Sequence, residues 1–563
     1  MSEVKEKPWY SHYDPGVPRE VEYPQAPLWK ILENSAANFP DRQAVNFLGM
    51  RGITYSELWE SARRFAAGLQ TRGVKKGDRV AIALPNSIHY VIAYYGTLLA
   101  GAVVVNLNPL YTARELRDML VDSGAETLVV LDFMGWPRYL EIEREVPVKQ
   151  VITARIQDYL PFPISLIYPL KAMHDKTFIR LPTHPKRIGF TDFLRQAEPN
   201  PKPVDQSIDD LALLQFTAGT TGMPKAAMLS HRNLMANAHQ TVSWAAGRLI
   251  PGQEVFLCLI PFFHVFGMTV GMNSGISLGA TLVVMPQPDL KEAIALIEKF
   301  GVTMMPGVPT LYIGFNNFPG IEKRKVGQIK VCVSGAAPLP VEVASRFEEL
   351  TGGKLVEGYG LSEASPVTHA NPLYGLRKTG SIGVPFPSVD AKVVEVKDGY
   401  IVELPAGTEG ELAVTGPNIM MGYWNRPMES SETMIDGWLL TGDIAKQDED
   451  GYFYIVDRKK DLIIASGYNV YPREVEEVLY EHPAVMEAAV VGIPDPYRGE
   501  NVKAVIVLRP EFKGKVSEED IIAFSRKNLA AYKIPRKVEF RDELPKNTVG
   551  KVLRRELKED IKA

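Results

Sequence analysis

A stretch rich in glycine and threonine, FTAGTTGMPK at residues 216–225, contains the residue types that bind phosphate. Backbone N–H groups and a nearby cation can both point at phosphate oxygens. Gly219 and Gly222 would let the backbone approach an anion closely, and Lys225 would supply charge. The stretch lacks the pattern G-x-x-x-x-G-K-[ST], so a P-loop kinase or GTPase is not expected. Its hydroxyl donors would be Thr217, Thr220 and Thr221.

Six further short motifs follow in a fixed order. They are PFFHVFG (261–267), SGAAPLP (334–340), EGYGLSEASP (357–366), TGD (441–443), YIVDRKKDLIIASGYNVYP (454–472) and PKNTVGK (545–551). Each is weak alone, but the ordered set resembles the acyl-adenylate-forming (AMP-binding) superfamily over most of the chain. That superfamily includes acyl-CoA synthetases, firefly-type luciferases and peptide-synthetase adenylation domains. The strings GYGLSEASPVTHAN and DRKKDLIIASGYNVYPREVEE are most similar to bacterial long-chain fatty-acid–CoA ligases.

The resemblance implies a ligase reaction in two steps. The carboxylate of a long-chain fatty acid attacks the α-phosphate of ATP, which gives an acyl-adenylate and pyrophosphate. The thiol of coenzyme A (CoA) then displaces AMP. Because the first step brings two anions together, it needs cations and fixed dipoles more than a general base. The expected cofactor is Mg2+, and the expected partners are ATP, CoA and the fatty acid.

The resemblance also assigns a nucleotide site. Glu363 matches the magnesium ligand of the family, with Thr217 beside the ion, and Mg2+ often takes few protein carboxylates. Tyr359 is expected to stack on adenine, with Gly358 and Gly360 letting the base lie flat. The remaining residues assigned to this site are Gly335, Ala336 and Ala337 as the opposite wall, Glu357, Ser362 in a phosphate role, and Tyr454. The loop departs from the family at Ala218 and Ala226, where the family usually has Ser or Gly and then Gly.

Three charged residues carry the rest of the implied chemistry. Asp443 in TGD would accept from both ribose hydroxyls, and Arg458 would reach the ribose or phosphates. Lys551 in PKNTVGK would stabilise the transition state of adenylation. The resemblance implies that a C-terminal domain then turns about a hinge at Lys460. That turn would replace Lys551 with a CoA path lined by Ser466, Gly467, Tyr468 and Asn469.

The acyl site is expected around PFFHVFGM. His264 takes the position where the family keeps an aromatic residue beside the substrate carboxylate. Its acyl pocket would continue along Val265, Gly267 and Met268. The small and aliphatic residues that follow favour a long chain, because each buried methylene adds about 0.8 kcal/mol. A metal role for His264 is not expected, since no second His or Cys lies at ligand spacing.

Several rival functions are weighed against this one. A luciferase would be expected to have Lys at position 464, where this chain has Ile464. A peptide-synthetase module would need a carrier domain after Lys551. A fatty-acyl-AMP ligase usually has an insertion that hinders domain rotation, and none is seen between residues 460 and 551. A medium-chain or aryl acyl-CoA synthetase stays open, and a lipid-binding protein without catalysis would not need Lys551, Glu363 and Asp443 together.

The elements that position these residues follow from the sequence pattern. With 563 residues the chain is too long for one core. Helical spacing at 54–75 and alternating apolar runs predict an α/β fold of stacked, mostly parallel sheets. Closely spaced turn residues after Gly399 predict a small antiparallel sheet or barrel. The predicted domains are 1–459, which binds AMP, and 460–563, a small mobile α+β domain.

The composition of the chain indicates which partners and which cellular compartment to expect. The chain has 63 Lys and Arg against 67 Asp and Glu, so no nucleic-acid partner is expected. Two uncharged stretches, Val80–Ala113 and Val255–Pro288, are broken by polar residues and proline, which favours buried strand–helix–strand units over membrane spans. The N-terminus has no apolar signal segment, which favours the cytoplasm and free cysteines. Residues 156–190 are either a surface connection or a contact with the inner face of the membrane. A homodimer also stays open.

Overall fold

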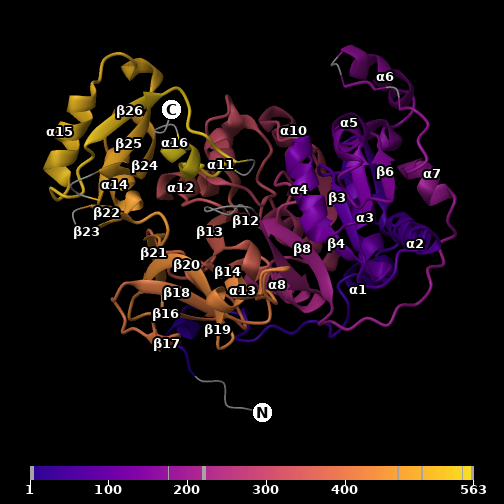
Figure 1. Cartoon of the computed structure of the whole chain (residues 1–563), viewed down its shortest axis with the longest axis horizontal. Coiled ribbons are helices and arrows are strands. Elements are labelled where there is room, and N and C mark those ends of the chain that lie inside the picture. Colours follow the sequence, from indigo (N-terminus) through magenta and orange to yellow (C-terminus); the bar gives the residue numbers. More distant parts are fainter. Residues whose placement is uncertain are drawn as a thin grey trace.

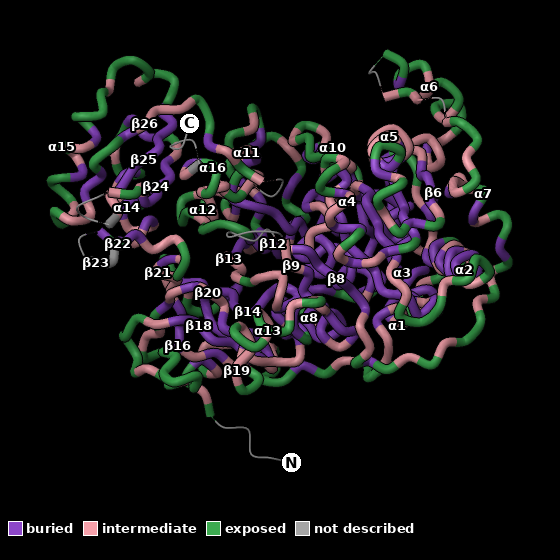
Figure 2. Tube along the Cα trace, viewed as in Figure 1, coloured by how far each residue is buried: buried purple, intermediate pink, exposed green. Residues whose placement is uncertain are grey.

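The computed structural model describes residues 6–174, 177–179, 181–217, 224–465, 468–495, 499–547 and 550–559. Figure 1 shows a large body and a smaller C-terminal lobe (yellow), which meet near strands β12 and β13. The buried residues in Figure 2 gather along the strands of the large body, and a second group lies inside the lobe. The predicted α/β fold is confirmed, with mostly parallel sheets in the large body.

The first sheet is built from repeated strand–helix–strand units. Six of its seven strands run parallel, and β9 pairs antiparallel with β8. Strands β4 and β5 are buried along their whole length, as expected where helices cover both faces. In spatial order the strands are β7 (Arg187–Gly189), β6 (Gln150–Ala154), β5 (Thr127–Leu131), β3 (Arg79–Ala83), β4 (Val103–Asn106), β8 (Leu211–Thr217) and β9 (Lys225–Ser230). The helices of this part are α2 (Tyr55–Thr71), α3 (Ile88–Leu99), α4 (Ala113–Ser123), α5 (Asp132–Ile142), α7 (Phe190–Arg195) and α8 (His231–Trp244).

The second sheet has two four-stranded parts joined through Met304, which bridges Phe256 of one part and Val331 of the other. The first part comprises β10 (Val255–Cys258), β11 (Thr281–Val284), β1 (Gln43–Phe47) and β2 (Arg51–Thr54). The second comprises β12 (Val331–Ser334), β13 (Lys354–Gly360), β14 (Val367–Ala370) and β15 (Val384–Pro385). The helices of this part are α1 (Lys30–Asn38), η3 (Gly267–Asn273), α9 (Ser274–Ser277), α10 (Leu290–Phe300), α11 (Pro309–Asn316), η4 (Ile321–Lys323), α12 (Val341–Thr351) and η5 (Ser362–Ala364).

An antiparallel sheet and the C-terminal lobe complete the chain. The antiparallel sheet comprises β16 (Asp390–Lys397), β17 (Tyr400–Glu403), β18 (Gly410–Thr415), β19 (Met434–Ile435), β20 (Trp438–Gln447) and β21 (Phe453–Arg458), with helix α13 (Pro427–Thr433) and the N-terminal η1 (Pro8–His12). The lobe comprises β22 (Ile463–Ala465), β23 (Tyr468–Val470), β24 (Val485–Asp495), β25 (Gly499–Leu508) and β26 (Lys537–Arg541), with α14 (Pro472–Tyr480), η6 (Pro510–Phe512), α15 (Glu518–Asn528) and α16 (Arg554–Glu559). Because the lobe has its own core and begins just after Lys460, its limits are compatible with the predicted boundary, which stays a prediction.

Local sequence signals account for several element ends. The helix expected at 54–75 is α2, and Thr54 caps it in a reciprocal pair with Glu57. The stretch from Val80 is the unit β3–α3–β4, as predicted. The stretch from Val255 is the unit β10–η3–α9–β11, but η3 is a π-helix, which apolar periodicity does not reveal. Within the described ranges no helix is long and apolar enough to cross a membrane.

The described residues of the range 156–190 include a distinct projection. They contain η2 (Ile156–Tyr159) and α6 (Ile164–His174), followed by β7. In Figure 1, α6 stands away from the large body beyond α5.

Elsewhere, Cys258 and Cys332 are buried free thiols, as the sequence predicted.

Candidate functional site

The stretch that is predicted to bind phosphate joins β8 to β9. Thr217 ends β8, Lys225 begins β9, and the two residues are paired across the strands. The loop residues assigned to the site, Gly219, Thr220, Thr221 and Gly222, lie outside the described residues. Both ends of the loop are therefore held by sheet hydrogen bonds, while its own contacts stay a prediction.

Glu363 and Lys225 meet at one tyrosine. The Tyr423 hydroxyl donates to Glu363 Oε1 over 2.8 Å, and the Lys225 ammonium lies 5.1 Å from the centroid of the Tyr423 ring. Burial and the Glu363 charge raise the pKa of Tyr423, so its hydroxyl stays a donor. Sequence reasoning missed Tyr423, although the Gly-Tyr-Trp string at 422–424 was a visible signal.

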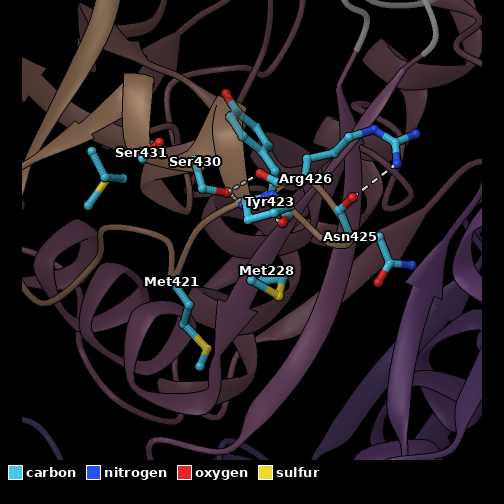
Figure 3. A pocket seen from close by; sticks show the side chains of 9 residues that line it. Met228, Met421, Tyr423, Asn425, Arg426, Ser430 and Ser431 are labelled. Carbon is cyan, nitrogen blue, oxygen red and sulfur yellow. Dashed lines mark hydrogen bonds between the residues drawn. The ribbon is translucent and has the colours of Figure 1, made fainter.

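A surface pocket of about 510 Å³ adjoins this tyrosine (Figure 3). Its lining residues are Met228, Met421, Tyr423, Asn425, Arg426, Pro427, Ser430, Ser431 and Met434. Ser430 Oγ accepts from the Tyr423 N–H over 2.8 Å and donates to the Arg426 carbonyl over 2.7 Å. Neither Glu363 nor Lys225 lines the pocket, so we do not assign it to the nucleotide. Its packing instead holds Tyr423 in place.

Asp443 is the centre of a second polar group. It lies on β20 directly opposite Arg458 on β21, and the Arg458 Nε atom lies 3.2 Å from Asp443 Oδ1. The Tyr359 hydroxyl donates to Asp443 Oδ2 over 2.5 Å. Burial, followed by the Asp443 charge, raises the pKa of Tyr359 well above its usual value. The three residues therefore form a fixed donor–acceptor set that could bind vicinal hydroxyls.

Tyr454 does not join this group. Its hydroxyl donates to Asp448 Oδ2 over 3.1 Å, and Lys446 lies 5.9 Å from the ring centroid. Because Tyr454 pairs with Lys446 while Asp443 pairs with Arg458, the β-sheet register separates the two sites. The nucleotide role assigned to Tyr454 stays a prediction without a contact to support it.

Close packing requires small residues at Gly358 and Gly360, the first of the two predicted adenine walls. A Cβ atom on Gly358 would lie 2.7 Å from Val333, and one on Gly360 would lie 2.1 Å from the Pro366 carbonyl oxygen. These glycines therefore allow β12, β13 and the Pro366 segment to approach closely. The flat seat for adenine that the resemblance implies at Gly358 and Gly360 stays a prediction.

The opposite wall, at Gly335, Ala336 and Ala337, follows β12. A Cβ atom on Gly335 would lie 3.2 Å from the Phe266 ring. Ala336 has a φ of 69°, which is uncommon for a residue with a side chain and typical of functional loops.

Glu357 connects the two walls. Its Oε2 atom accepts from the Leu339 N–H over 2.8 Å, so β13 is tied to the loop after β12. Burial raises the pKa of Glu357 to about 7, although that hydrogen bond and Arg473 oppose the change. Ser362 lies beyond β13 as the first residue of η5, next to Glu363.

The predicted acyl residues lie at the start of η3. His264 is half-buried, and its Nδ1 atom accepts from the Phe266 N–H over 3.2 Å. Burial lowers the pKa of His264 to about 4, and the Lys551 charge contributes in the same direction, so the imidazole is neutral. Val265 and Met268 are buried, and a Cβ atom on Gly267 would lie 2.4 Å from the Pro261 carbonyl oxygen. This segment is tightly packed against its own preceding turn.

Lys551 is delivered by the C-terminal lobe. Asn547 shapes its loop, accepting from the Lys551 N–H over 2.8 Å and donating its own N–H to the Lys551 carbonyl over 2.9 Å. Gly550 has a φ of 81°, and its Cβ position would lie 3.8 Å from Thr310 Oγ1 at the start of α11. The loop thus reaches from the lobe to the large body.

The electrostatics place the Lys551 ammonium among the predicted site residues. The residue keeps contact with solvent, but partial dehydration lowers its pKa to about 8, and the Arg458 cation acts in the same direction. The Asp443 carboxylate opposes the change. The Lys551 charge is therefore coupled electrostatically to Arg458, Asp443 and His264, although Lys551 lies far from all three in the sequence.

The hinge region is held by contacts that the sequence did not reveal. Lys460 lies in the turn between β21 and β22. Before it, Asp457 Oδ2 accepts from the Arg473 N–H at the start of α14 over 2.8 Å. After it, Asp461 lies 3.2 Å from Arg554, which also donates to both oxygens of Glu476 over 2.8 Å. The lobe is thus fixed to both sides of Lys460.

The predicted CoA path is only partly described. Ser466 and Gly467 lie outside the described residues, and the side chains of Tyr468 and Asn469 are not described either. The backbone of β23 pairs with β22. In Figure 1 these two strands lie on the side of the lobe away from β8, whereas α16 lies near α11 and α12. The two faces of the lobe are therefore distinct.

Comparison with known proteins identifies the family. The family model for the AMP-binding enzyme matches residues 32–424, and the model for its C-terminal domain matches residues 474–551. A long-chain-fatty-acid–CoA ligase of Bacillus subtilis is 46% identical over 560 residues, which covers 99% of this chain and 98% of the relative.

Two solved structures of MatB from Rhodopseudomonas palustris are also similar. The ATP-bound form has a TM-score of 0.83 at 32% identity, and the apo form has a TM-score of 0.73 at 31% identity. Each comparison covers 96% of this chain and 99% of the other. From these matches and from the residues assembled above, this chain belongs to the AMP-binding enzyme family.

Proposed function

We propose that this chain is an ATP-dependent long-chain fatty-acid–CoA ligase. It converts a fatty acid, ATP and CoA to acyl-CoA, AMP and pyrophosphate through an acyl-adenylate. The observation that carries the proposal is the meeting of Lys551, from the C-terminal lobe, with Arg458, Asp443 and His264 of the large body. Full-length similarity to the ligase of Bacillus subtilis supports the acid–thiol ligase class.

Charge neutralisation explains the first step. The fatty-acid carboxylate and the α-phosphate repel each other, and negative charge spreads over the phosphorus oxygens as the new bond forms. Lys551 and Arg458 supply cations on one side, and Lys225 supplies a cation near the loop. Asp443 binds the ribose hydroxyls as acceptor, and Tyr359 keeps its carboxylate oriented. The neutral His264 holds the acyl-phosphate end without adding a charge.

The donor set also fits the magnesium ion of the family. Glu363 uses one oxygen for the Tyr423 hydrogen bond, and Thr217 ends β8 at the loop that would hold the phosphates. Mg2+ is satisfied by one or two carboxylates when phosphate oxygens and water complete its shell. Bound there, the ion would withdraw charge from the phosphates. No group of three His, Cys, Asp or Glu in the described ranges offers another metal site.

The second step requires Lys551 to leave. In the present arrangement Gly550 of the Lys551 loop lies near Thr310 of the large body, while β22 and β23 lie on the side of the lobe away from β8 (Figure 1). Turning the lobe about Lys460 would break the Arg473 contact with Asp457 and carry Asp461 and Arg554 as one unit. We propose that this turn brings the segment 466–469 to the acyl-adenylate and opens the path for CoA.

The alternative functions differ in the acid that is activated or in the product that is released. Fatty-acyl-AMP ligases and medium-chain or aryl acyl-CoA synthetases remain alternatives, and a lipid-binding protein is the non-enzymatic one. The luciferase alternative has no support, since position 464 is an exposed isoleucine. The proposed setting is cytoplasmic, at the inner face of a membrane. The projecting α6 supports that contact, and a homodimer stays a prediction.

One incubation separates these functions. Purified protein is mixed with ATP, MgCl2, CoA and either decanoate, oleate or benzoate, and the products are resolved by chromatography. Oleoyl-CoA with an equal amount of AMP is expected. Oleoyl-adenylate that accumulates despite CoA would indicate a fatty-acyl-AMP ligase, and benzoyl-CoA alone would indicate an aryl enzyme. Binding of oleate without ATP consumption would contradict any ligase function.

A further inference from the structure

Helix α6 exposes an apolar face that the reaction does not explain. Within it, Leu166, Ile167, Leu170 and Met173 are between 57% and 69% exposed, and Phe162 just before the helix is 80% exposed. These helical positions follow i, i+1, i+4 and i+7, which places them on one side. Ala172 is the one buried residue of the helix. A face of this kind is rarely left in contact with water.

The charge around α6 differs from that of the chain as a whole. Residues 160–187 contain five Lys or Arg and one Asp, whereas the full chain has a net charge of −4. The segment 160–174, which includes the whole helix, contains no Asp or Glu. Lys171 is exposed on α6, and Lys186 follows before β7. An apolar helix with basic neighbours matches a surface of anionic lipid, which combines hydrocarbon with negative headgroups.

The length of α6 fits a position in the plane of the interface. Its 11 residues span roughly 16 Å at 1.5 Å per residue, against about 30 Å for the hydrocarbon layer. The helix is therefore too short to cross a bilayer. It is long enough to bury one face at the boundary between headgroups and acyl chains, as interfacial helices do.

The base of the projection is fixed next to the acyl site. Asp158 of η2 lies 3.1 Å from His89 Nε2 on α3, and the Tyr159 ring packs on the His89 ring at 4.7 Å between centroids. The next residue of α3, Tyr90, donates its hydroxyl to the Phe262 carbonyl over 2.8 Å. Phe262 lies two residues before His264. A membrane contact through α6 is thus mechanically linked to the segment that receives the acid.

From these observations we infer that α6, with Phe162, is a membrane-docking element that inserts into the interface of an anionic bilayer. The inference rests on the proposed function, because a long-chain fatty acid partitions into membranes and would be taken up there. The occupant is a lipid surface, since the apolar face is accompanied by positive charge and by no acidic side chain in residues 160–174.

The test uses the full-length protein and two matched triple variants. One changes Leu166, Ile167 and Leu170 to Ser. The control changes Tyr400, Val402 and Met428, which are 69%, 42% and 74% exposed on β17 and α13, to Ser. Binding is measured by co-sedimentation with vesicles of phosphatidylcholine containing 30% phosphatidylglycerol. The wild type and the control are expected to bind alike, and the α6 variant at least tenfold more weakly.

A site-specific probe gives a second readout. Because Cys258 and Cys332 are buried, Leu170→Cys can be labelled with an environment-sensitive fluorophore, with Met428→Cys as control. A blue shift on adding vesicles is expected at position 170 and not at position 428. Equal vesicle binding by the two triple variants, or no shift at position 170, would overturn the inference. A change of oligomeric state in the α6 variant with unchanged vesicle binding would instead identify a protein-docking face.

The substrate comparison separates this inference from the proposed function. With decanoate and no vesicles, all three proteins are expected to form acyl-CoA at equal rates. With oleate held in vesicles, the α6 variant is expected to be at least fivefold slower. A wild type that forms decanoyl-CoA but ignores vesicles would contradict membrane docking alone. One that binds vesicles but forms no acyl-CoA would contradict the ligase function alone.

Discussion

The depressed pKa of Lys551 makes a quantitative prediction for the adenylation step. Only the ammonium form can stabilise the negative charge of the transition state. The pKa of this group is lowered to about 8. The Lys551 side chain is therefore mostly protonated at pH 7 and only roughly 10% protonated at pH 9. The kcat/KM for ATP–pyrophosphate exchange should therefore fall about tenfold between these pH values. A lysine with its ordinary pKa would stay protonated over this range.

Two variants locate the titrating group. Lys551→Arg keeps a charge at every pH of the experiment, so its activity, although lower, should show no decline near pH 8. The Arg458 cation lowers the pKa of Lys551, so Arg458→Gln should raise that pKa and move the decline to higher pH. The assay follows exchange of labelled pyrophosphate into ATP from pH 6.5 to 9.5. A decline that persists unchanged in Lys551→Arg would refute the assignment, as would a wild-type profile that is flat up to pH 9.5.

Three further predictions concern the supporting residues. Tyr359→Phe removes a hydrogen bond to the charged Asp443, and such a bond typically contributes about 1.5–3 kcal/mol. The variant should therefore lower kcat/KM for ATP roughly tenfold or more in the exchange assay. An unchanged value would exclude the ribose role of Asp443. Removing Mg2+ with EDTA should abolish exchange. Glu363→Gln should raise the Mg2+ concentration for half-maximal activity at least tenfold. An unaltered Mg2+ titration in this variant would place the ion elsewhere. Arg554→Ala leaves Glu476 and Asp461 without their cation and should lower the free energy of unfolding of the lobe by about 2 kcal/mol in chemical unfolding. Arg554→Lys should recover part of this loss. Equal stability of the two variants and the wild type would show that these ion pairs contribute nothing.

The sequence was most informative where one short motif carries both structure and chemistry. Asp443 and Arg458 were assigned from separate motifs, and the register of β20 and β21 places them opposite each other. Thr54 predicted the start of α2 because a capping hydroxyl acts within one turn. The uncharged stretches were correctly assigned to strand–helix–strand units, since polar and proline residues interrupted them at short intervals.

Long-range contacts were beyond this reasoning. Tyr423 holds Glu363 from 60 residues away, and no periodicity connects the two. Arg554 reaches Asp461 across 93 residues, a pairing that depends on how the lobe folds. The sequence also did not reveal that strand packing by itself requires Gly358 and Gly360, because an added Cβ atom would meet Val333 or Pro366, which lie elsewhere in the sequence. The sequence did not predict the π-helix η3, since in a short apolar run the period of a π-helix differs little from that of an α-helix.

The proposed reaction depends on a C-terminal lobe that supplies Lys551 to one half-reaction and withdraws it for the other. Lys551→Ala assayed in both halves is the most direct test. ATP–pyrophosphate exchange is expected to fall by at least a hundredfold, whereas transfer of a preformed oleoyl-adenylate to CoA is expected to proceed at close to the wild-type rate. Equal loss of the two half-reactions would contradict the proposed reaction, because a residue withdrawn from the site cannot be needed for the second step.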